Sequence, residues 1–255
     1  MVRFDVVTYT SVVTTPISWL QFLGSIIMRL LTWNLAMLER SAAAPQAWQQ
    51  FHTEAAIRDF VLDIGPDVVC YQELPNQVPF VETLDLLRAT TRTHNGNLAT
   101  LVTHEIAATE PAVTVVDGIA VLATFDDELT IANVHLAPGP GVADHRVEQI
   151  SKVVAASPTH NLLIIGDTNT RLEEAALLLD NGFSGVKPPA ATWDSRANRF
   201  RFGGPEFTAY FTRWFASPGL VVSNVVVHRE PAEFQGARFH LSDHYALSLE
   251  LGPSS

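Results

Sequence analysis

Residues 161–169 read Asn-Leu-Leu-Ile-Ile-Gly-Asp-Thr-Asn, an apolar run that ends in two polar side chains placed two positions apart. A short, continuous apolar run of this kind predicts a strand over Asn161–Gly166 that is buried on both faces. Asp167 and Asn169 follow at the carboxyl end of that strand. The stretch therefore predicts a buried sheet with a polar site at its edge.

Polar residues also mark the ends of other predicted strands. These residues, with the pair above, are Asn34, Glu73, His135, Asp167, Asn169, Asp243 and His244. A single polar residue at a strand end is usually an ordinary turn or cap residue. Several gathered at one rim would supply hard oxygen ligands for Mg²⁺ or Mn²⁺ and an inventory of acids and bases. Such a rim suits the chemistry of phosphate esters.

Short strand patterns alternate with helical patterns from Met28 onward. Expected strands cover Arg29–Asn34, Asp67–Gln72, 98–102, Ala112–Val116, Ile119–Phe125, Leu129–His135, Asn161–Gly166, Leu220–His228 and His244–Leu251. Expected helices cover Gln46–Ile64, 78–90, Val142–Ala156 and Glu173–Leu179. Helices mixed with mostly antiparallel strands predict a single α+β domain, in which two packed, mainly antiparallel sheets are flanked by helices.

The composition limits the classes of function. The chain has 255 residues, 47% of them hydrophobic and 17% charged, which excludes a disordered protein. Lys+Arg number 16 against 27 Asp+Glu, a net charge of −11 that disfavours non-specific coating of nucleic acid. Any phosphate substrate must therefore be met locally. The single cysteine, Cys70, lies in an apolar run and predicts a small buried side chain in a cytoplasmic protein without disulfides.

The first 27 residues differ in pattern from the rest of the chain. They are apolar but interrupted by Thr, Ser, Gln and Pro16, which makes them a poor membrane span and a weak signal peptide. Because Met28 directly precedes the first predicted strand, residues 1–27 are expected to be an extension of doubtful origin, either poorly ordered or translated from upstream sequence. The domain is expected to cover residues 28–255, as a monomer without a membrane span.

Five segments form an ordered set of motifs along the chain. They are Leu31-Thr-Trp-Asn34, Asp67-Val-Val-Cys-Tyr-Gln-Glu73, Ala132-Asn-Val-His135-Leu, Ile164-Ile-Gly-Asp167-Thr-Asn169 and Leu241-Ser-Asp243-His244. In this order they resemble the endonuclease/exonuclease/phosphatase superfamily, which includes deoxyribonuclease I and the abasic-site endonucleases. The resemblance spans residues 29–251 and implies the four-layer α/β sandwich of deoxyribonuclease I.

Three further features are similar to one branch, the type-2 tyrosyl-DNA phosphodiesterases. They are Gly166-Asp-Thr-Asn-Thr-Arg171, Thr192-Trp193-Asp194, and the spacing from Phe211-Thr-Arg-Trp-Phe215 to Ser242-Asp-His244. This likeness implies a metal-dependent phosphodiesterase of nucleic-acid 5′ ends or adducts, with a role in DNA repair. Two alternatives stay open: a phosphatase or phosphodiesterase of a small soluble ester, and a weakly active or non-catalytic binding protein on the same fold.

The resemblance implies a role for each polar residue of the rim. Glu73 would be the principal ligand of Mg²⁺ or Mn²⁺, helped by Asn34 and, through water, by Asp243. Asp167 would orient or deprotonate the attacking water, and Asn169 would hold a phosphoryl oxygen. His244 would donate to a non-bridging or leaving oxygen, with His135 as a second donor. The predicted catalytic residues are thus Asn34, His135, Asp167, Asn169, Asp243 and His244.

Two residues beyond the rim are predicted to contact substrate. Arg171 would clamp the phosphate, and Trp193 would stack on a base or line the leaving-group side. The competing interpretation of Arg171 is a surface charge beside a helix, and that of Trp193 is core packing.

The chain departs from the resembled branch at two positions. Ala36 stands where the first motif usually carries an acid, so the site holds one carboxylate fewer. Thr212 stands where the branch has an Asp that orients the final histidine, and a hydroxyl stabilises an imidazolium less well than a carboxylate does.

Overall fold

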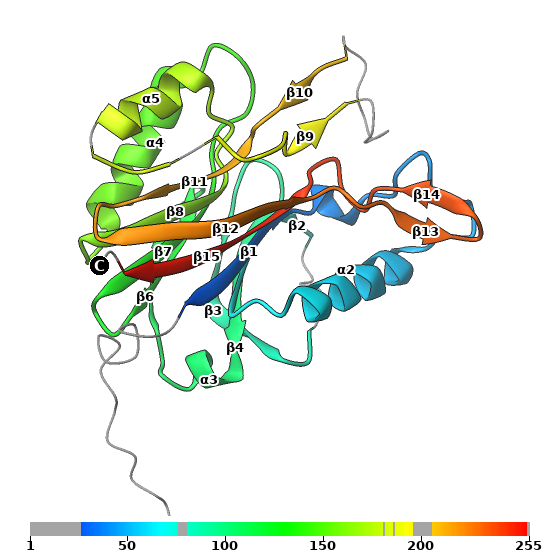
Figure 1. Ribbon diagram of the computed structural model, residues 1–255, viewed down its shortest axis with the longest axis horizontal. Helices are drawn as coiled ribbons and strands as arrows, with labels where there is room; N and C mark the ends of the chain where they lie inside the picture. Colours follow the sequence, from blue (N-terminus) through cyan, green and yellow to red (C-terminus); the bar gives the residue numbers. More distant parts are fainter. Residues whose placement is uncertain (1–26, 76–80, 181, 186, 196–205, 254–255) are drawn as a thin grey trace, which may run out of the picture.

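The computed structural model describes residues 27–75, 81–180, 182–185, 187–195 and 206–253. Two sheets dominate it (Figure 1). The first has the strand order β12 (Leu220–His228), β15 (Ala246–Pro253), β1 (Met28–Asn34), β2 (Val68–Leu74), β4 (Asn97–Thr103) and β3 (Leu84–Arg92). The second has the order β11 (Thr212–Ala216), β8 (Asn161–Asp167), β7 (Leu129–His135), β6 (Ala120–Phe125) and β5 (Ala112–Val116).

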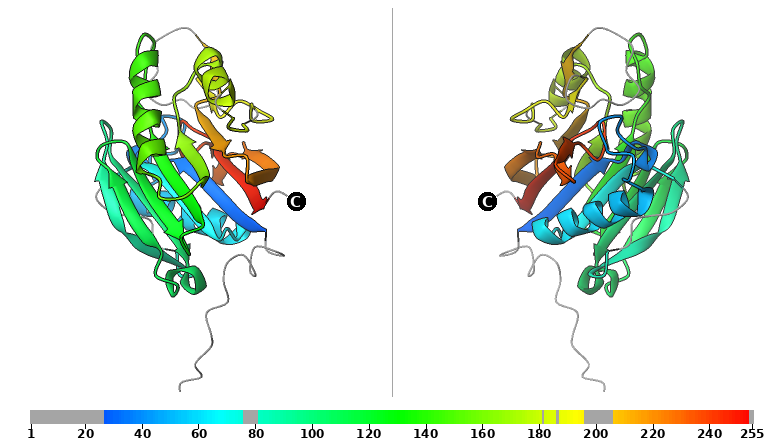
Figure 2. Two further views of the ribbon diagram at one scale, coloured as in Figure 1. Left: turned by 90° about the vertical axis from the view of Figure 1, so that its left-hand side faces the viewer. Right: turned by 90° about the vertical axis from the view of Figure 1, so that its right-hand side faces the viewer.

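The helices lie on the outer sides of the two sheets (Figure 2). Ile57 and Val61 of α2 (Gln50–Ile64) pack on the outer face of the first sheet. Ile150 and Val153 of α4 (Ala143–Ala156), with Ala175 of α5 (Leu172–Asp180), pack on the outer face of the second. The order helix, sheet, sheet, helix confirms the four-layer sandwich and the α+β class.

Smaller elements complete the described chain. They are the 3-10 turn η1 (Ala36–Leu38), the helix α3 (His104–Ala107), and the hairpins of β9 (Trp193–Asp194) with β10 (Thr208–Ala209) and β13 (Ala232–Phe234) with β14 (Ala237–Phe239). Helix α2 ends at Gly65, whose left-handed φ of 59° lets its N–H reach the carbonyl of Val61. Among the described residues, no helix is long and apolar enough to span a membrane.

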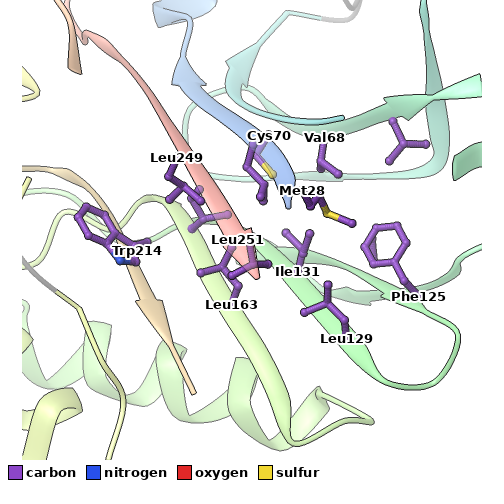
Figure 3. Close-up of a cluster of buried hydrophobic side chains, with 14 of the residues drawn as sticks. Met28, Val68, Cys70, Phe125, Leu129, Ile131, Leu163, Trp214, Leu249 and Leu251 are labelled. Carbon is purple, nitrogen blue, oxygen red and sulfur yellow. The ribbon is translucent and has the colours of Figure 1, made fainter. Parts of the chain in front are cut away.

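The inner faces of the two sheets form one hydrophobic cluster (Figure 3). Cys70 lies in it fully buried, as predicted, and burial raises the pKa of its thiol to about 12. Leu30 of the first sheet faces the same cluster as Ile131 and Leu163 of the second. Full burial of each such side chain contributes roughly 1.5–3 kcal/mol. Every second residue of the central strands therefore holds the sheets face to face, and the residues between them, such as Ala132 and Ile164, pack in the cluster under the helices.

The helix predicted over 78–90 is wrong for the residues that the structure describes. Residues 76–80 lie outside them, and Leu84–Arg92 is the edge strand β3, antiparallel to β4. The β-branched pair Thr90 and Thr91 leads into a turn at Asn95-Gly96, with φ of 80° at Gly96. Asn-Gly between two apolar runs is a hairpin signal, and this turn chemistry outweighs the helical spacing of the leucines.

Other boundaries differ by a few residues. The helix predicted from Gln46 begins at Gln50, and the strand predicted from His244 begins at Ala246. Residues 1–26 of the predicted extension lie outside the described part of the chain, and Met28 begins β1, paired with Leu251.

Each sheet contains one pair of parallel neighbours. Strand β1 is parallel to β2, with Asn34 opposite Gln72, and β7 is parallel to β8, with His135 opposite Asp167. Because the carboxyl ends of parallel strands lie at one edge, these two pairs bring four chain segments to the same rim of the sandwich.

Buried polar side chains join the two sheets just below this rim. The amide nitrogen of Asn133 on β7 donates to the carbonyls of Tyr71 and Ala99, at 3.1 and 2.9 Å, across the interface. The amide nitrogen of Gln72 donates to the side-chain oxygen of Asn133 at 2.8 Å. Gly166 makes room for this contact, since a Cβ there would lie 2.2 Å from the Val134 carbonyl and 3.2 Å from the Gln72 amide.

Replacing Asn133 by Leu should destabilise the fold. The change removes one of three acceptors of the Gln72 amide nitrogen and the side-chain donor to two buried carbonyls, and a buried polar group left without a partner costs about 1–3 kcal/mol. We expect thermal unfolding, followed by circular dichroism, to show a loss of roughly 3 kcal/mol and a Tm lower by about 6–12 °C. Thr124→Val is the control, since it removes one buried hydroxyl contact to Thr130. Equal melting of the two variants would contradict the role given to Asn133.

Candidate active site

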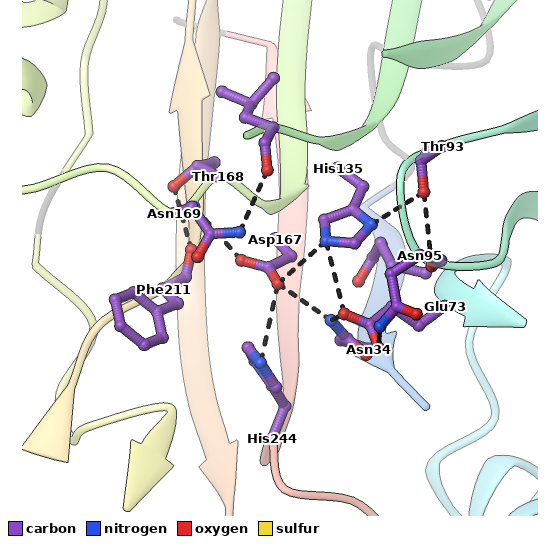
Figure 4. Close-up of polar contacts among 12 residues, drawn as sticks. Asn34, Glu73, Thr93, Asn95, His135, Asp167, Thr168, Asn169, Phe211 and His244 are labelled. Atoms are coloured by element: carbon purple, nitrogen blue, oxygen red, sulfur yellow. Dashed lines mark hydrogen bonds and ion pairs between the residues drawn. The ribbon is translucent and has the colours of Figure 1, made fainter. Parts of the chain in front are cut away.

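The predicted rim residues converge on one carboxylate, that of Asp167 (Figure 4). Its Oδ2 accepts a hydrogen bond from Asn34 Nδ2 at 2.9 Å and lies 3.6 Å from Nε2 of both His135 and His244. Its Oδ1 accepts from the backbone N–H of Asn169 at 3.2 Å. The side chains of Asn34, His135, Asp167 and His244 come from β1, β7, β8 and the segment before β15. The structure thus brings these predicted residues together at one rim.

Glu73 reaches the rim because β2 is irregular there. Its φ is 50°, and the pairing of β2 with β4 shifts register between Tyr71 and Leu74. Asn34 Nδ2 donates to Glu73 Oε1 at 3.0 Å, and Asn95 Nδ2 donates to Oε2 at 2.5 Å. The bulge turns the Glu73 carboxylate toward the site.

Burial and neighbouring carboxylates make Glu73 hard to ionise. Burial raises the pKa of Glu73 to about 7, with smaller contributions in the same direction from Asp167 and Asp243. The hydrogen bond from Asn34 and the charge of His244 act in the opposite direction. An added cation would favour the charged form of this group.

His135 is a neutral imidazole at the same site. Its Nε2 lies 3.5 Å from Glu73 Oε1, and its Nδ1 lies 3.1 Å from Thr93 Oγ1. Burial lowers the pKa of His135 to about 4, although the charge of Asp167 opposes the shift. At neutral pH, His135 therefore has a nitrogen lone pair or an N–H to offer and no charge.

The chemistry and spacing of these side chains fit a divalent cation. One ligand atom from each of Glu73, His135 and Asp167 can be chosen so that all three lie within 4.8 Å of one another. The two carboxylates supply the oxygen ligands that Mg²⁺ and Mn²⁺ prefer, and the neutral imidazole beside them adds no charge that would repel the ion. Of the ligands predicted from sequence, Glu73 is in this group. The Asn34 side-chain oxygen accepts from the Ala36 N–H at 3.0 Å, and Asp243 is half-buried close enough to act on Glu73.

His244 lies between Asp167 and Thr212. Its Nδ1 is 3.5 Å from Thr212 Oγ1, on the opposite side of the ring from the Asp167 contact. Ser242 and Trp33 hold the backbone, since Ser242 Oγ accepts from the His244 N–H at 3.1 Å and Trp33 Nε1 donates to the His244 carbonyl at 3.0 Å. Thr212 therefore occupies the position from which a side chain can orient this histidine.

Asn169 and Arg171 lie on the loop after β8. Asn169 adopts φ of 50°, and its amide nitrogen donates to the Leu136 carbonyl at 3.1 Å, which joins the loops that follow β7 and β8. Arg171 donates to the Asn169 carbonyl at 2.9 Å, and its guanidinium carbon lies 4.7 Å from the centre of the Phe211 ring. Arg171 is thus held against the loop, at the edge of the site.

Trp193 lies beside His244 in an aromatic cluster. Its backbone forms an isolated bridge with His244, and its ring centre is 4.6 Å from that of Phe207 and 5.9 Å from that of Phe211. Trp193 is 8% exposed, whereas Phe207 is 43% exposed. Packing therefore accounts for most of the Trp193 surface, and Phe207 presents the open face of the cluster.

The β3–β4 turn brings residues to the site that the sequence analysis missed. Thr93 contacts His135, Asn95 donates to Glu73, and the His94 ring centre lies 4.4 Å from that of His135. Desolvation at the site lowers the pKa of His94, although the residue is exposed and the charge of Asp167 opposes the shift. The Asn95-Gly96 dipeptide is the signal that could have revealed this hairpin, but the predicted helix over 78–90 obscured it.

The match to a protein family agrees with this geometry. The model of the Endonuclease/Exonuclease/phosphatase family matches residues 31–244, and the chain belongs to this family. Its members are phosphoric ester hydrolases, so the chain is an enzyme of this class. No curated protein matches the chain in sequence.

Solved structures of the same fold include two proteins named TDP2. TDP2 from D. rerio, in complex with a single-strand DNA product, has a TM-score of 0.67 and 16% identity over 89% of this chain and 100% of that one. Truncated TDP2 from Caenorhabditis elegans has a TM-score of 0.66 and 17% identity over 89% and 98%. The human Nocturnin catalytic domain with bound sulfate has a TM-score of 0.59 and 13% identity over 89% and 94%.

Stabilisation by a divalent cation should increase with pH. Without a cation, the raised pKa of Glu73 means that its contribution to stability is full below its unfolded value and is lost as pH rises through about 7. A cation binds the charged form, so the Tm increment given by Mg²⁺ or Mn²⁺ should grow between about pH 5.5 and 7.5. Glu73→Gln should abolish most of this increment in Tm, whereas Glu54→Gln, at a partly exposed position on α2, should not. A pH-independent increment would exclude Glu73 as the ligand.

Replacing Thr212 by Asp should increase turnover. A carboxylate 3.5 Å or less from His244 Nδ1 would fix the tautomer and favour the protonated ring that donates to phosphate. We expect a rise on the order of tenfold in kcat, and a basic limb of the pH–rate profile displaced to higher pH. Thr212→Asn is the matched control, because the Asn side chain has the shape of Asp without its negative charge. If both variants leave the pH profile where it is, Thr212 does not act on His244.

Proposed function

We propose that the chain is a Mg²⁺- or Mn²⁺-dependent phosphodiesterase that acts at nucleic-acid 5′ ends or on adducts attached to them, in the manner of a tyrosyl-DNA phosphodiesterase. The observation that carries the proposal is the cluster of Glu73, His135 and Asp167, with His244 on its far side. The proposal includes a role in DNA repair and a cytoplasmic, monomeric protein.

The acidic residues account for the need for a cation. Glu73, Asp167 and Asp243 would repel a phosphate, and a bound divalent ion would offset their charge and polarise a phosphoryl oxygen. Glu73 would hold this ion, with Asn34, Asp243 and the neutral His135 beside it. The hydrogen bonds from Asn34 to both Glu73 and Asp167 support this assignment, because they hold the two carboxylates toward each other.

Asp167 is suited to orient the attacking water. Its Oδ1 is fixed by the Asn169 N–H, and its Oδ2 faces the site, where it can accept a proton from water. His244 then donates a hydrogen bond to the phosphoryl or leaving oxygen as negative charge develops. Asn169 would contact a second phosphoryl oxygen, and Arg171 would add a positive charge at the edge of the site.

The aromatic cluster supports a substrate with a planar group. Phe207 offers an exposed ring within a cluster that extends through Trp193 to Phe211, whose ring centre is 6.2 Å from that of His244. Bases and tyrosyl rings stack on surfaces of this kind. The similar fold of D. rerio TDP2, solved with a single-strand DNA product, agrees with such a substrate.

A small soluble phosphate ester is the second candidate substrate. The net charge of −11 favours a short ligand over a long duplex, because few phosphates can be neutralised. A third possibility, a binding protein with little activity, rests on Ala36 and Thr212, which remove two acids that the resembled branch carries.

A panel of substrates distinguishes the three candidate functions. We expect turnover of a 5′-tyrosyl oligonucleotide with Mg²⁺ or Mn²⁺, lost with chelator and reduced at least 100-fold in Asp167→Asn. Plain single and double strands, an abasic duplex, inositol phosphates and a chromogenic phosphodiester complete the panel. Turnover of inositol phosphates alone would replace the proposal by the small-ester function. Cation binding without any turnover would favour the binding protein.

A further inference from the structure

Three basic side chains near the site lack a carboxylate partner. Within the described parts of the chain, Arg171, Lys187 and Arg213 make no ion pair with an acid, whereas Arg146 and Arg229 are paired with Glu174 and Asp194. Among the described residues Arg29, Arg40, Arg92 and Arg238 also make no ion pair, so what sets these three cations apart is that they gather around two consecutive aromatic residues, Tyr210 and Phe211. They suggest an anion that comes from outside the chain.

The segment between β10 and β11 contacts all three cations through two consecutive aromatic side chains. Phe211 is next to His244 and supports Arg171. The preceding residue, Tyr210, supports the other two: Lys187 Nζ lies 4.1 Å and the Arg213 guanidinium carbon 6.0 Å from the centre of its ring. A path of contacts therefore leads from His244 to Phe211 and Arg171, and from there along the chain to Tyr210, which contacts Lys187 and Arg213.

Arg213 is held in a fixed position on this path. It is 5% exposed, and its Nε donates to the Tyr210 carbonyl at 2.7 Å. No hydrogen bond to its two terminal nitrogens is found among the residues described. Burial and the charge of Arg171 lower the pKa of Arg213, Tyr210 and Glu174 act in the opposite direction, and a bound anion would further favour the charged form.

We propose that Lys187, Arg213 and the Tyr210 ring form a second subsite, which binds the backbone phosphate and base next to the reacting phosphate in a single-stranded nucleic-acid end. This inference rests on the proposed function and extends it. Aromatic rings alternating with cations are the recognition surface of single-stranded nucleic acid, where bases stack and phosphates meet positive charge. A small ester would occupy only the site of the reacting phosphate, whereas a strand would also reach the second subsite.

The subsite also explains how an acidic enzyme can bind a strand. The field of the whole molecule opposes a polyanion, and the three cations provide local attraction along one path. Because only a few phosphates are neutralised, the dependence of affinity on salt should be shallow, with a slope of about 0.7 for each contacted phosphate.

The test measures binding of 5′-phosphorylated, phosphorothioate-linked strands to the full chain by fluorescence anisotropy at several salt concentrations. Lys187→Glu should weaken binding of a six-nucleotide strand about tenfold and lower the salt slope by about 0.7. A mononucleoside monophosphate, which cannot reach both subsites, should lose much less affinity when measured by competition. Lys152→Glu is the control, because Lys152 is exposed on α4 and paired with Glu148.

Arg213→Gln tests the buried residue of the second subsite. It should reproduce the length-dependent loss while its Tm stays within a few degrees of the parent; if it fails to fold, exposed Lys187→Glu alone decides. Unchanged affinity and slope in Lys187→Glu, or no strand binding by the parent, overturns the subsite. Strand binding that depends on Lys187 without turnover of any substrate leaves the subsite standing and overturns the proposed function. Turnover of the 5′-tyrosyl strand with normal binding by Lys187→Glu overturns the subsite alone.

Discussion

The hydrogen bonds of the Asn133 amide across the sheet interface set the position of everything at the rim. Apolar packing between the sheets has no direction, and it would tolerate small shifts of one sheet over the other. Asn133 removes that freedom, because its amide binds backbone carbonyls of both β2 and β4. Glu73 lies two residues beyond Tyr71, and His135 two residues beyond Asn133. The separation of these two side chains is therefore fixed by a polar contact beneath them.

The electrostatics of the rim follow from the same crowding. Burial raises the pKa of Glu73 to about 7, and the neighbouring carboxylates of Asp167 and Asp243 add to the shift. The histidine between them does not compensate, since burial keeps His135 neutral. Amide donors from Asn34 and Asn95 stabilise the negative charges without neutralising them. The site therefore has negative charge that its own residues do not neutralise, and a bound divalent cation would offset it.

Much of this architecture could be predicted from the sequence, because continuous apolar runs and polar strand ends are local signals. The stretch around Asp167 indicated both a buried strand and its polar edge, and the ordered motifs indicated the fold. The edge strand β3 was missed, since its leucines fit a helix equally well and the decisive Asn95-Gly96 turn lies beyond them. The contacts of Lys187 and Arg213 with Tyr210 could not be foreseen either, because they join three separate segments whose proximity depends on tertiary packing.

The β3–β4 turn has a further consequence for how such an enzyme can diversify. It touches Glu73 and His135 through Asn95, His94 and Thr93, yet it belongs to an edge hairpin that only β4 joins to its sheet. Exchanges in this turn therefore act on the rim itself, because Thr93 and Asn95 contact His135 and Glu73, and a Cβ at Gly96 would lie 2.7 Å from the Leu74 carbonyl. Evolution, or an engineer building a library, can adjust the surroundings of Glu73 and His135 through this turn without replacing any residue of the buried strands.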